Sequence, residues 1–410
     1  MNFARWETLE NMKELVPLND GTKSGLPIAY EGDKIYIDSR NYHSIVIGTA
    51  GSGKTQAITL PMLKFACMGG ESVIIRDFND EVYNMTKDMF KENNYNIFKL
   101  NLDDAIDTNC WNPYDIVKKL YNEGNFDKAT ELIEEISYYL LNDVEEKNSD
   151  PFWINSTVSY FTGIILYALK EGKDVTIETI YDIDELIREN PEKFLKGLDK
   201  HSPMYINLSG VLGNAKETLA SIFSIFSGKM KNIMTKENLR KMLSKSDFDI
   251  SKLEKTIIYV KSGKTSISNN LFSLFVNQVY STKLDTDRLN IIIDDFYTLN
   301  PIKNFPRVLN YSVNMGISFT IMIRGFNDLK TVYGKEETEM IKLGFTNIVY
   351  LLSQDMETLE EISRMCGNKS QTTPLISIEE LKTLDMFEAI ILTTRMMPFR
   401  TKLLPYYKMK

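Results

Sequence analysis

The run from Gly48 to Thr55 has the residue types and spacing of a phosphate-binding loop. It reads Gly-Thr-Ala-Gly-Ser-Gly-Lys-Thr and fits the pattern G-x-x-x-x-G-K-[ST]. A glycine-rich turn lets successive backbone N–H groups converge on phosphate oxygens. An apolar, strand-like stretch precedes the loop and a helix-like stretch follows it, as this chemistry requires. We therefore expect nucleotide contacts from Thr49, Ala50, Gly51, Ser52, Gly53, Lys54, Thr55 and Gln56.

Two side chains at the end of this loop would carry its polar chemistry. Lys54 would place a positive charge on the β- and γ-phosphates, and the Thr55 hydroxyl would bind Mg²⁺. ATP with Mg²⁺ is the expected ligand. A second run, Ser262 to Thr265, also reads Ser-Gly-Lys-Thr but has Ile258 where the first glycine should stand. We expect this second run not to bind nucleotide.

A phosphate loop also needs an acidic element, because a metal ion and an attacking water must be held opposite the γ-phosphate. The stretch Leu289 to Ile293 is mostly apolar and is followed by Asp294 and Asp295. This is the pattern of a Walker B strand. Asp294 would hold the metal, usually through water, and Asp295 would orient or polarise the attacking water. The alternative is a surface turn that carries two aspartates.

Polar residues also follow two other predicted strands. Arg324 ends one of them and could reach a phosphate, so we place it beside Lys54 and Asp295 as a catalytic candidate; an ordinary exposed arginine is the alternative. Asp77 and Glu81 follow the other strand. They form either a third acidic element or the capping residues of a helix N-terminus.

Composition limits the class of protein. A chain of 410 residues favours two or three domains, and 43% hydrophobic residues supply their cores. The three cysteines and two histidines are far apart, which argues against disulfides and metal clusters. No apolar run reaches the ~18 residues of a membrane helix, and no signal peptide is visible. The net charge of −8 means that any contact with DNA must come from a local patch or a pore.

Short apolar strands alternate with amphipathic helices in two separate parts of the chain, as in a doubly wound α/β domain. Between about residues 114 and 254 the strand signals nearly vanish and helical spacing takes over. There, apolar residues at three- and four-residue intervals predict a core-facing stripe made of Leu219, Ile222, Phe223, Phe226, Met230 and Ile233. The expected strands are Ser44–Ile47, Ser72–Arg76, Asn96–Leu100, Thr256–Val260, Asn290–Ile293, Ser318–Ile323, Asn347–Leu352 and Ala389–Thr393.

The predicted architecture is α/β: one RecA-like P-loop nucleotide-binding domain with an inserted all-helical domain. Residues 1–113 would form the first part of the nucleotide-binding domain, residues 114–254 the helical insertion, and residues 255–410 the second part of the nucleotide-binding domain.

These motifs, in this order, resemble the type IV coupling proteins, a family of ATPases that serve conjugation and type IV secretion. The residues from Arg76 to Glu81 stand where the family has Asp-Pro-Lys-Gly-Glu, and they match it at Asp77 and Glu81. The other matching segments are Phe3 to Trp6, the phosphate loop, Leu60 to Leu63, Trp111 to Asp115, Tyr333 with Gly334, Asp355 to Thr358, and Ile362 with Ser363.

The resemblance implies a coupling ATPase that works as a hexameric ring on the cytoplasmic side of the cell membrane. Its cargo would be single-stranded DNA with a relaxase and accessory proteins, delivered to the channel of a type IV secretion system; carriage of protein substrates stays open. The family's N-terminal membrane helices have no counterpart here. The resemblance therefore implies that this chain is itself soluble, with its inner-membrane anchor removed or supplied by another protein.

Three positions depart from the family and keep a rival function open. The family ends its Walker B strand with Asp-Glu, whereas Asp295 is one methylene shorter. After the next strand the family has a glutamine, where this chain has Arg324. The family also has an arginine before a Gly-Ile pair; here Val313 and Asn314 offer no equivalent, although Arg307 lies nearby. The rival is a nucleotide-binding cargo adapter with little or no hydrolysis. A small-molecule kinase is disfavoured, because the insertion shows no lid of arginines.

The helical insertion has two halves of opposite charge. Residues 115–192 contain 18 acidic and 7 basic residues, and residues 193–254 contain 6 acidic and 11 basic residues. This asymmetry predicts a surface that selects cargo by charge, the alternative being an ordinary solvated helical surface. The candidate cargo contacts are Asp143, Glu145, Glu146 and Asp150 in the acidic half, and Lys229, Lys231, Lys236, Arg240 and Lys241 in the basic half.

Overall fold

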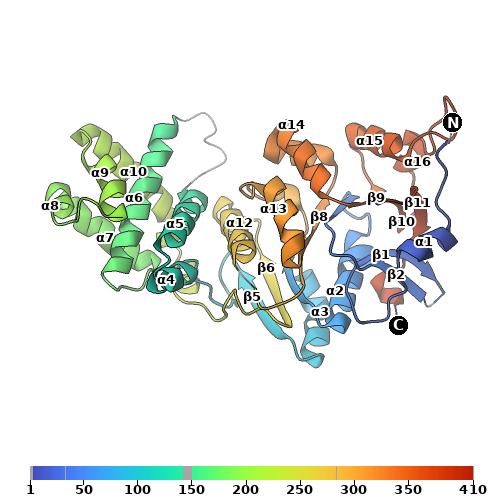
Figure 1. Cartoon of the computed structure of the whole chain (residues 1–410), viewed down its shortest axis with the longest axis horizontal. Helices are drawn as coiled ribbons and strands as arrows, with labels where there is room; N and C mark the ends of the chain where they lie inside the picture. The colour runs from blue at the N-terminus through green and yellow to red at the C-terminus, as the bar shows by residue number, and fades with distance from the viewer. Residues whose placement is uncertain (1–2, 33, 142–149, 283, 410) are drawn as a thin grey trace. The chain divides into compact units, whose positions relative to one another are not determined.

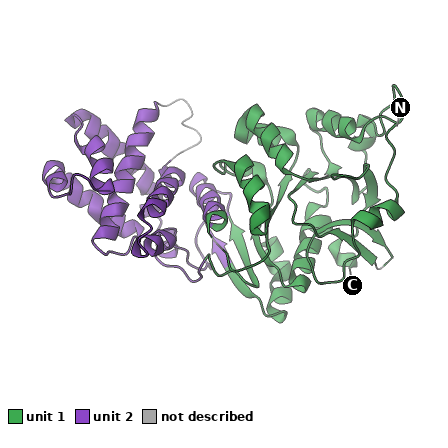
Figure 2. Cartoon of the chain, viewed as in Figure 1, with its two compact units in different colours: residues 1–98, 250–261, 279–410 green, residues 99–249, 262–278 purple. Residues whose placement is uncertain are grey.

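The computed structural model describes residues 3–32, 34–141, 150–282 and 284–409 (Figure 1). The chain forms two compact units (Figure 2). The first unit, which we call the sheet unit, comprises residues 1–98, 250–261 and 279–410. The second, the helical unit, comprises residues 99–249 and 262–278. Residues 99–113 and 262–278 thus group with the helices, although they fall outside the insertion drawn from the sequence.

Nine strands form one sheet in the order β11-β10-β9-β3-β8-β7-β4-β6-β5. The strands from β9 to β6 in this order run parallel, and β10 is antiparallel to both β9 and β11. Every residue of β3, β4, β7 and β8 is buried, as expected for parallel strands covered on both faces. Their bounds are β3 (Ser44–Gly48), β4 (Ser72–Arg76), β5 (Asn96–Asn101), β6 (Thr256–Lys261), β7 (Leu289–Ile293), β8 (Ile317–Ile323), β9 (Asn347–Leu352), β10 (Glu388–Leu392) and β11 (Phe399–Lys402).

All eight predicted strands are present, each within one residue of its predicted bounds. The sequence did not predict the edge strand β11 or the separate antiparallel hairpin of β1 (Leu26–Glu31) and β2 (Lys34–Asp38). β1 contains Pro27, β11 has only four residues, and none of the three is buried along its whole length as the central strands are.

The connections between strands place helices on both faces of the sheet. The crossovers that contain α2 and α3 lead along the sheet in one direction, whereas those that contain α13 and α14 lead in the other; right-handed connections therefore put the two pairs on opposite faces (Figure 1). The helices are α1 (Leu9–Leu15), η1 (Thr55–Thr59), α2 (Leu60–Gly69), α3 (Glu81–Glu92), α12 (Ser266–Ser281), η3 (Phe296–Thr298), α13 (Phe305–Ser312), η4 (Val313–Met315), α14 (Phe326–Gly344), α15 (Met356–Cys366), α16 (Ile378–Lys382) and η5 (Tyr406–Lys408).

The helical unit packs around α6. Gly163 of α6 lies so close to α9 that an added Cβ would meet Leu208 at 2.5 Å, so a side chain there would separate the two helices. Of the predicted stripe on α10, Ile222, Phe226, Met230 and Ile233 are buried, which confirms that it faces the core. The helices are α4 (Asp115–Asn122), α5 (Phe126–Leu141), α6 (Pro151–Lys170), α7 (Ile177–Glu189), α8 (Pro191–Lys196), α9 (Pro203–Leu212), α10 (Lys216–Met234) and α11 (Glu237–Met242).

Within the described ranges, α6 alone has the length and apolar composition of a membrane-crossing helix. Its residues from Tyr160 to Leu166 are buried among the other helices of its unit. The fold therefore uses this apolar segment as a core helix.

Candidate nucleotide-binding site

The predicted site residues follow neighbouring strands at one edge of the sheet. The phosphate loop follows β3, Arg324 follows β8, Asp294 and Asp295 follow β7, and Asp77 follows β4. These four strands are adjacent and parallel, with Ile47 opposite Ile323 and Ile293 opposite Ile321. The carboxyl ends of parallel strands meet at one edge, where α/β proteins bind their ligands. The structure thus brings together residues that are 270 positions apart in the sequence.

The phosphate loop has the backbone conformation that its glycines predict. Gly51 and Gly53 have φ values of 77° and 90°, which residues with side chains rarely adopt. A Cβ at Gly48 would lie 2.3 Å from Ser52 Oγ, so no larger residue fits where the loop leaves the strand. The first helical turn after the loop, η1, is a π-helix, with the Leu60 N–H bonded to the Thr55 carbonyl.

Lys54 lies folded over the loop. Its Nζ donates to the carbonyl oxygens of Gly48 at 2.7 Å and Thr49 at 3.2 Å. Two other polar atoms of the loop region, Ser52 Oγ and Gln56 Oε1, are buried without a hydrogen-bond partner in the described chain. Buried polar groups normally have partners, so these two atoms are compatible with a polar ligand or water at the loop.

The two aspartates after β7 are held by the backbone of their own turn. Asp294 Oδ1 accepts the Asp295 N–H at 2.8 Å, and Asp295 has a φ of 47°. Burial raises the pKa of Asp294, and the neighbouring Asp295 carboxylate raises it further, while the positive charges of Lys54 and Arg76 lower it. A half-buried carboxylate beside the loop lysine is well placed to receive a cation.

Arg76, at the end of β4, supports this turn. Its side chain is 2% exposed, and Nη1 donates to the carbonyl oxygens of Asp294 at 2.9 Å and Asp295 at 3.0 Å. A planar guanidinium can hold two carbonyls in a fixed geometry. No local sequence pattern selects Arg76, because only the pairing of β4 with β7 brings it to the aspartates.

Arg324 lies between the loop strand and the aspartate strand but is engaged locally. Its Nη2 and Nε donate to Asp328 at 2.8 and 3.2 Å, and its guanidinium carbon lies 3.8 Å from the centre of the Tyr297 ring. Half of the side chain is nevertheless exposed. Arg324 therefore stands at the edge of the site, preorganised by an acidic and an aromatic partner.

Asp77 fits the capping alternative. Its buried carboxylate accepts the N–H of Tyr83 in the first turn of α3 at 2.8 Å. Burial raises the pKa of Asp77, and the nearby carboxylates of Asp80 and Glu81 act in the same direction. Asp80 forms an ion pair with Lys261 at 2.7 Å. These carboxylates are thus tied to the start of α3 and to β6.

In the second Ser-Gly-Lys-Thr run, a carboxylate of the same unit accepts the backbone N–H groups. Asp103 Oδ1 accepts the N–H groups of Gly263 at 3.1 Å and Lys264 at 2.9 Å, and the Ser268 hydroxyl at 2.7 Å. Ile258, which replaces the first glycine, is a fully buried residue of β6. The N–H groups of this run that would face an anion therefore already donate to a carboxylate of the protein.

The residues at the loop fit a magnesium ion that is shared with a nucleotide. No group of three or more His, Cys, Asp or Glu side chains in the described part of the chain could hold a metal alone. Mg²⁺ usually takes one or two protein oxygens and fills its remaining positions with phosphate oxygens and water. Thr55 and Asp294 are of the right type, and each lies at the loop edge of the sheet.

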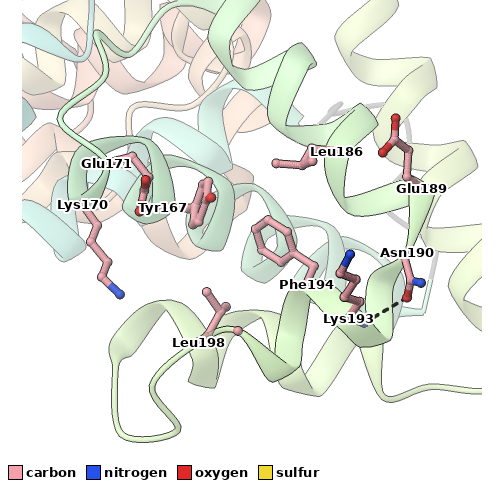
Figure 3. A pocket seen from close by; sticks show the side chains of 10 residues that line it. Tyr167, Lys170, Glu171, Leu186, Glu189, Asn190, Lys193, Phe194 and Leu198 are labelled. Carbon is pink, nitrogen blue, oxygen red and sulfur yellow. Dashed lines mark hydrogen bonds between the residues drawn. The ribbon is translucent and has the colours of Figure 1, made fainter.

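A pocket of about 480 Å³ lies in the helical unit (Figure 3). Its lining includes Tyr167, Leu186, Lys193, Phe194 and Leu198, from α6, α7, α8 and the segment that follows. It contains none of the predicted nucleotide contacts.

Comparison with known proteins identifies the family. A family model described as type IV secretory system conjugative DNA transfer matches residues 5–373. The chain therefore belongs to this family of conjugative DNA-transfer proteins, as its motifs predicted. Among curated proteins no match was found.

Solved structures of other proteins share the fold. The plasmid coupling protein TrwB in complex with the ATP analogue ADPNP gives a TM-score of 0.70 at 14% identity, over 98% of this chain and 94% of that chain. TrwB with ADP and Mg²⁺ gives 0.69 at 13% identity, over 98% and 93%. VirB4 of Thermoanaerobacter pseudethanolicus gives 0.57 at 13% identity, over 96% and 99%. The predicted fold class, RecA-like α/β with an all-helical insertion, is confirmed.

Proposed function

We propose that this chain is a coupling ATPase that recruits relaxase-bound single-stranded DNA and drives it into a type IV secretion channel. The observation that carries this proposal is the convergence of the phosphate loop, Asp294 and Asp295, and Arg324 at one edge of the sheet. The family supplies the setting of conjugative DNA transfer, and TrwB, which shares the fold, was solved with an ATP analogue and with ADP and Mg²⁺.

The residues have distinct proposed roles. The backbone of Thr49 to Gly53 and the first turn at Gln56 would bind the phosphates, and Lys54 would leave its present carbonyl partners to contact the β- and γ-phosphates. Thr55 and Asp294 would hold Mg²⁺, which neutralises phosphate charge when bound. Asp295 would orient the attacking water, its position fixed through Arg76.

Arg324 would act on the transferred phosphoryl group or on a neighbouring subunit. A cation at the end of the strand between β3 and β7 can stabilise charge that develops on the γ-phosphate. To do so it must exchange its ion pair with Asp328 for the new contact. The half-exposed guanidinium makes that exchange feasible.

The proposed assembly is a homohexameric ring at the cytoplasmic face of the inner membrane. Nucleotide would lie at each subunit boundary, and DNA would pass through the centre. Residues 114–254, inserted between residues 1–113 and 255–410 of the nucleotide-binding domain, would choose the cargo.

Charge-based choice of cargo is a finer proposal. Asp143, Glu145 and Glu146 lie outside the described residues, and Asp150 accepts the Phe152 N–H at the start of α6. In the basic half, Arg240 and Lys241 already pair with glutamates of their own unit. Reversing the four acidic residues to lysine should slow cargo association a few-fold at low salt without changing basal ATPase activity. An association rate that ignores both the reversal and the ionic strength would refute this proposal.

A nucleotide-binding cargo adapter remains the second candidate. Two observations favour it: Asp295 replaces the longer glutamate, and Arg324 replaces glutamine and is held by Asp328. Steady-state ATP hydrolysis, with and without single-stranded DNA, separates the two functions. The coupling ATPase requires turnover that DNA stimulates and that Lys54→Ala abolishes. An adapter would bind ATP with no turnover above that of Lys54→Ala.

A further inference from the structure

The phosphate loop has a second side, away from the aspartates. Strand β9 pairs with β3 on that side, and β10 runs antiparallel to β9. The beginning of β10 therefore lies at the same edge of the sheet as the end of β3. The residues just before β10 and just after β11 reach this edge, next to the loop and on the side opposite Asp294.

Two aromatic residues occupy this place. Phe387 lies directly against Gly53, so close that a Cβ on the glycine would meet its Cε1 atom at 2.7 Å. The ring of Tyr407, in η5, packs edge-on against Phe387 with the ring centres 6.4 Å apart. The helix η5 in turn packs against η1, the first turn after the loop. Phe387 and Tyr407 form what we call the aromatic platform.

The backbone holds the platform in an unusual conformation. Phe387 has a φ of 67°, which is rare and strained for a residue with a large side chain. Its carbonyl accepts the Leu403 N–H at 2.8 Å, which fixes the segments before β10 and after β11 to each other. Strain of this kind persists where surrounding contacts hold it, and here it directs an aromatic ring onto the phosphate loop.

The aromatic platform is partly exposed, unlike aromatic side chains that are buried in a core. Tyr407 is 64% exposed, and Met386, which precedes Phe387 in the sequence, is 55% exposed. Phe387 itself is half-buried. An exposed aromatic ring together with a thioether offers an apolar face to a flat ligand. Lys408 Nζ lies 6.0 Å from the centre of the Tyr407 ring.

We propose that Phe387 and Tyr407 bind the base of the nucleotide by stacking. This inference rests on the proposed nucleotide site, because the loop fixes where the phosphates lie. The metal ligands and the catalytic aspartate occupy the β7 side of the loop, so the γ-phosphate points that way and the base lies on the opposite, β10 side. Stacking needs only the face of an aromatic ring, and every nucleobase has one.

The test compares ATP with inorganic tripolyphosphate, which carries the phosphates without the base. Isothermal titration calorimetry with Mg²⁺ present would measure both affinities for the parent chain, Tyr407→Ala and Tyr407→Phe. Tyr311→Ala is the matched control, because Tyr311 is a similarly exposed tyrosine near the end of α13, which leads to the opposite edge of the sheet.

We expect Tyr407→Ala to weaken ATP binding about five- to tenfold, the loss of part of one stacking contact, and to leave tripolyphosphate binding unchanged. Tyr407→Phe should keep the parental affinity for ATP, and Tyr311→Ala should change neither ligand. Parental ATP affinity in Tyr407→Ala, or equal weakening of both ligands, would overturn the base-stacking role while leaving the nucleotide site intact. Failure of the parent chain to bind either ligand would instead overturn the proposed function, and the inference with it.

Discussion

The chain contains the tetrapeptide Ser-Gly-Lys-Thr twice, at residues 52–55 and 262–265, and the structure gives the two copies different partners. Each follows a parallel strand of the same sheet and precedes a helix. In the first, Gly51 and Gly53 open a wide turn, and polar atoms of Ser52 and Gln56 have no hydrogen-bond partner among the residues that the structure describes.

In the second copy, β6 continues to Lys261, so only Ser262 separates the strand from Gly263. The carboxylate of Asp103 accepts the N–H groups that would otherwise face an anion. The tetrapeptide therefore does not make a phosphate site by itself. Such a site also needs the four-residue turn between the strand and the glycine, as at residues 49–52, together with N–H groups that no carboxylate of the protein already occupies.

The largest difference between the copies should appear when each lysine is removed. Lys54→Ala should abolish ATP binding and hydrolysis while preserving the fold, because it removes the charge on the β- and γ-phosphates. Lys264→Ala, the matched control, should bind ATP as the parent does. A fluorescent ATP titration measures both. Unchanged affinity in Lys54→Ala would show that the first copy is not the site.

The next effect concerns the aspartates that follow β7, at the edge of the sheet where the first copy lies. Asp295→Asn should reduce turnover by about 10²- to 10⁴-fold and spare ATP binding, because the amide cannot accept the proton of the attacking water. Asp295→Glu should keep or raise turnover, since it restores the family's longer side chain. Steady-state and binding measurements on both variants test this. An asparagine variant with parental turnover would remove Asp295 from the mechanism.

Arg324 should have a smaller effect, which depends on its release from Asp328. Arg324→Gln should lower turnover by about 10²-fold if the guanidinium contacts the γ-phosphate in the same or a neighbouring subunit. Asp328→Asn should free the guanidinium and keep turnover at or above the parental rate. A glutamine variant with parental turnover and parental nucleotide affinity would leave Arg324 as a surface residue.

The smallest effect tests the internal carboxylate of the second copy. Asp103→Ala leaves two N–H groups and a hydroxyl without their charged acceptor, so it should reduce the free energy of unfolding by about 2 kcal/mol. Asp182→Ala, at an exposed position of α7, is the control and should change stability little. Chemical denaturation measures both. ATP affinity should stay parental, and a second bound nucleotide in Asp103→Ala would contradict the proposed difference between the copies.

Local signals in the sequence predicted much of the fold and indicated the candidate phosphate loop. The buried strands β3, β4 and β7 are long apolar runs, and the loop follows one of them with the full motif, so their positions were predictable. Asp294 and Asp295 are candidate site residues because they directly follow such a run.

The residues that the sequence analysis did not select depend on contacts between distant segments. Asp103 meets Gly263 from 160 positions away, Arg76 reaches Asp294 only through strand pairing, and Phe387 meets Gly53 because β10 turns back beside β9. No local pattern marks these residues, because a buried arginine or an exposed tyrosine has the same appearance in a sequence wherever it lies.

A crystal structure of the chain with a non-hydrolysable ATP analogue and Mg²⁺ tests the difference between the copies most directly. We predict phosphate density within the loop from Gly48 to Thr55, with Lys54 moved from the Gly48 carbonyl to the phosphates. The Asp103 carboxylate should remain on Gly263 and Lys264. Phosphate density at residues 262–265, or an empty first loop at saturating nucleotide, would contradict the account.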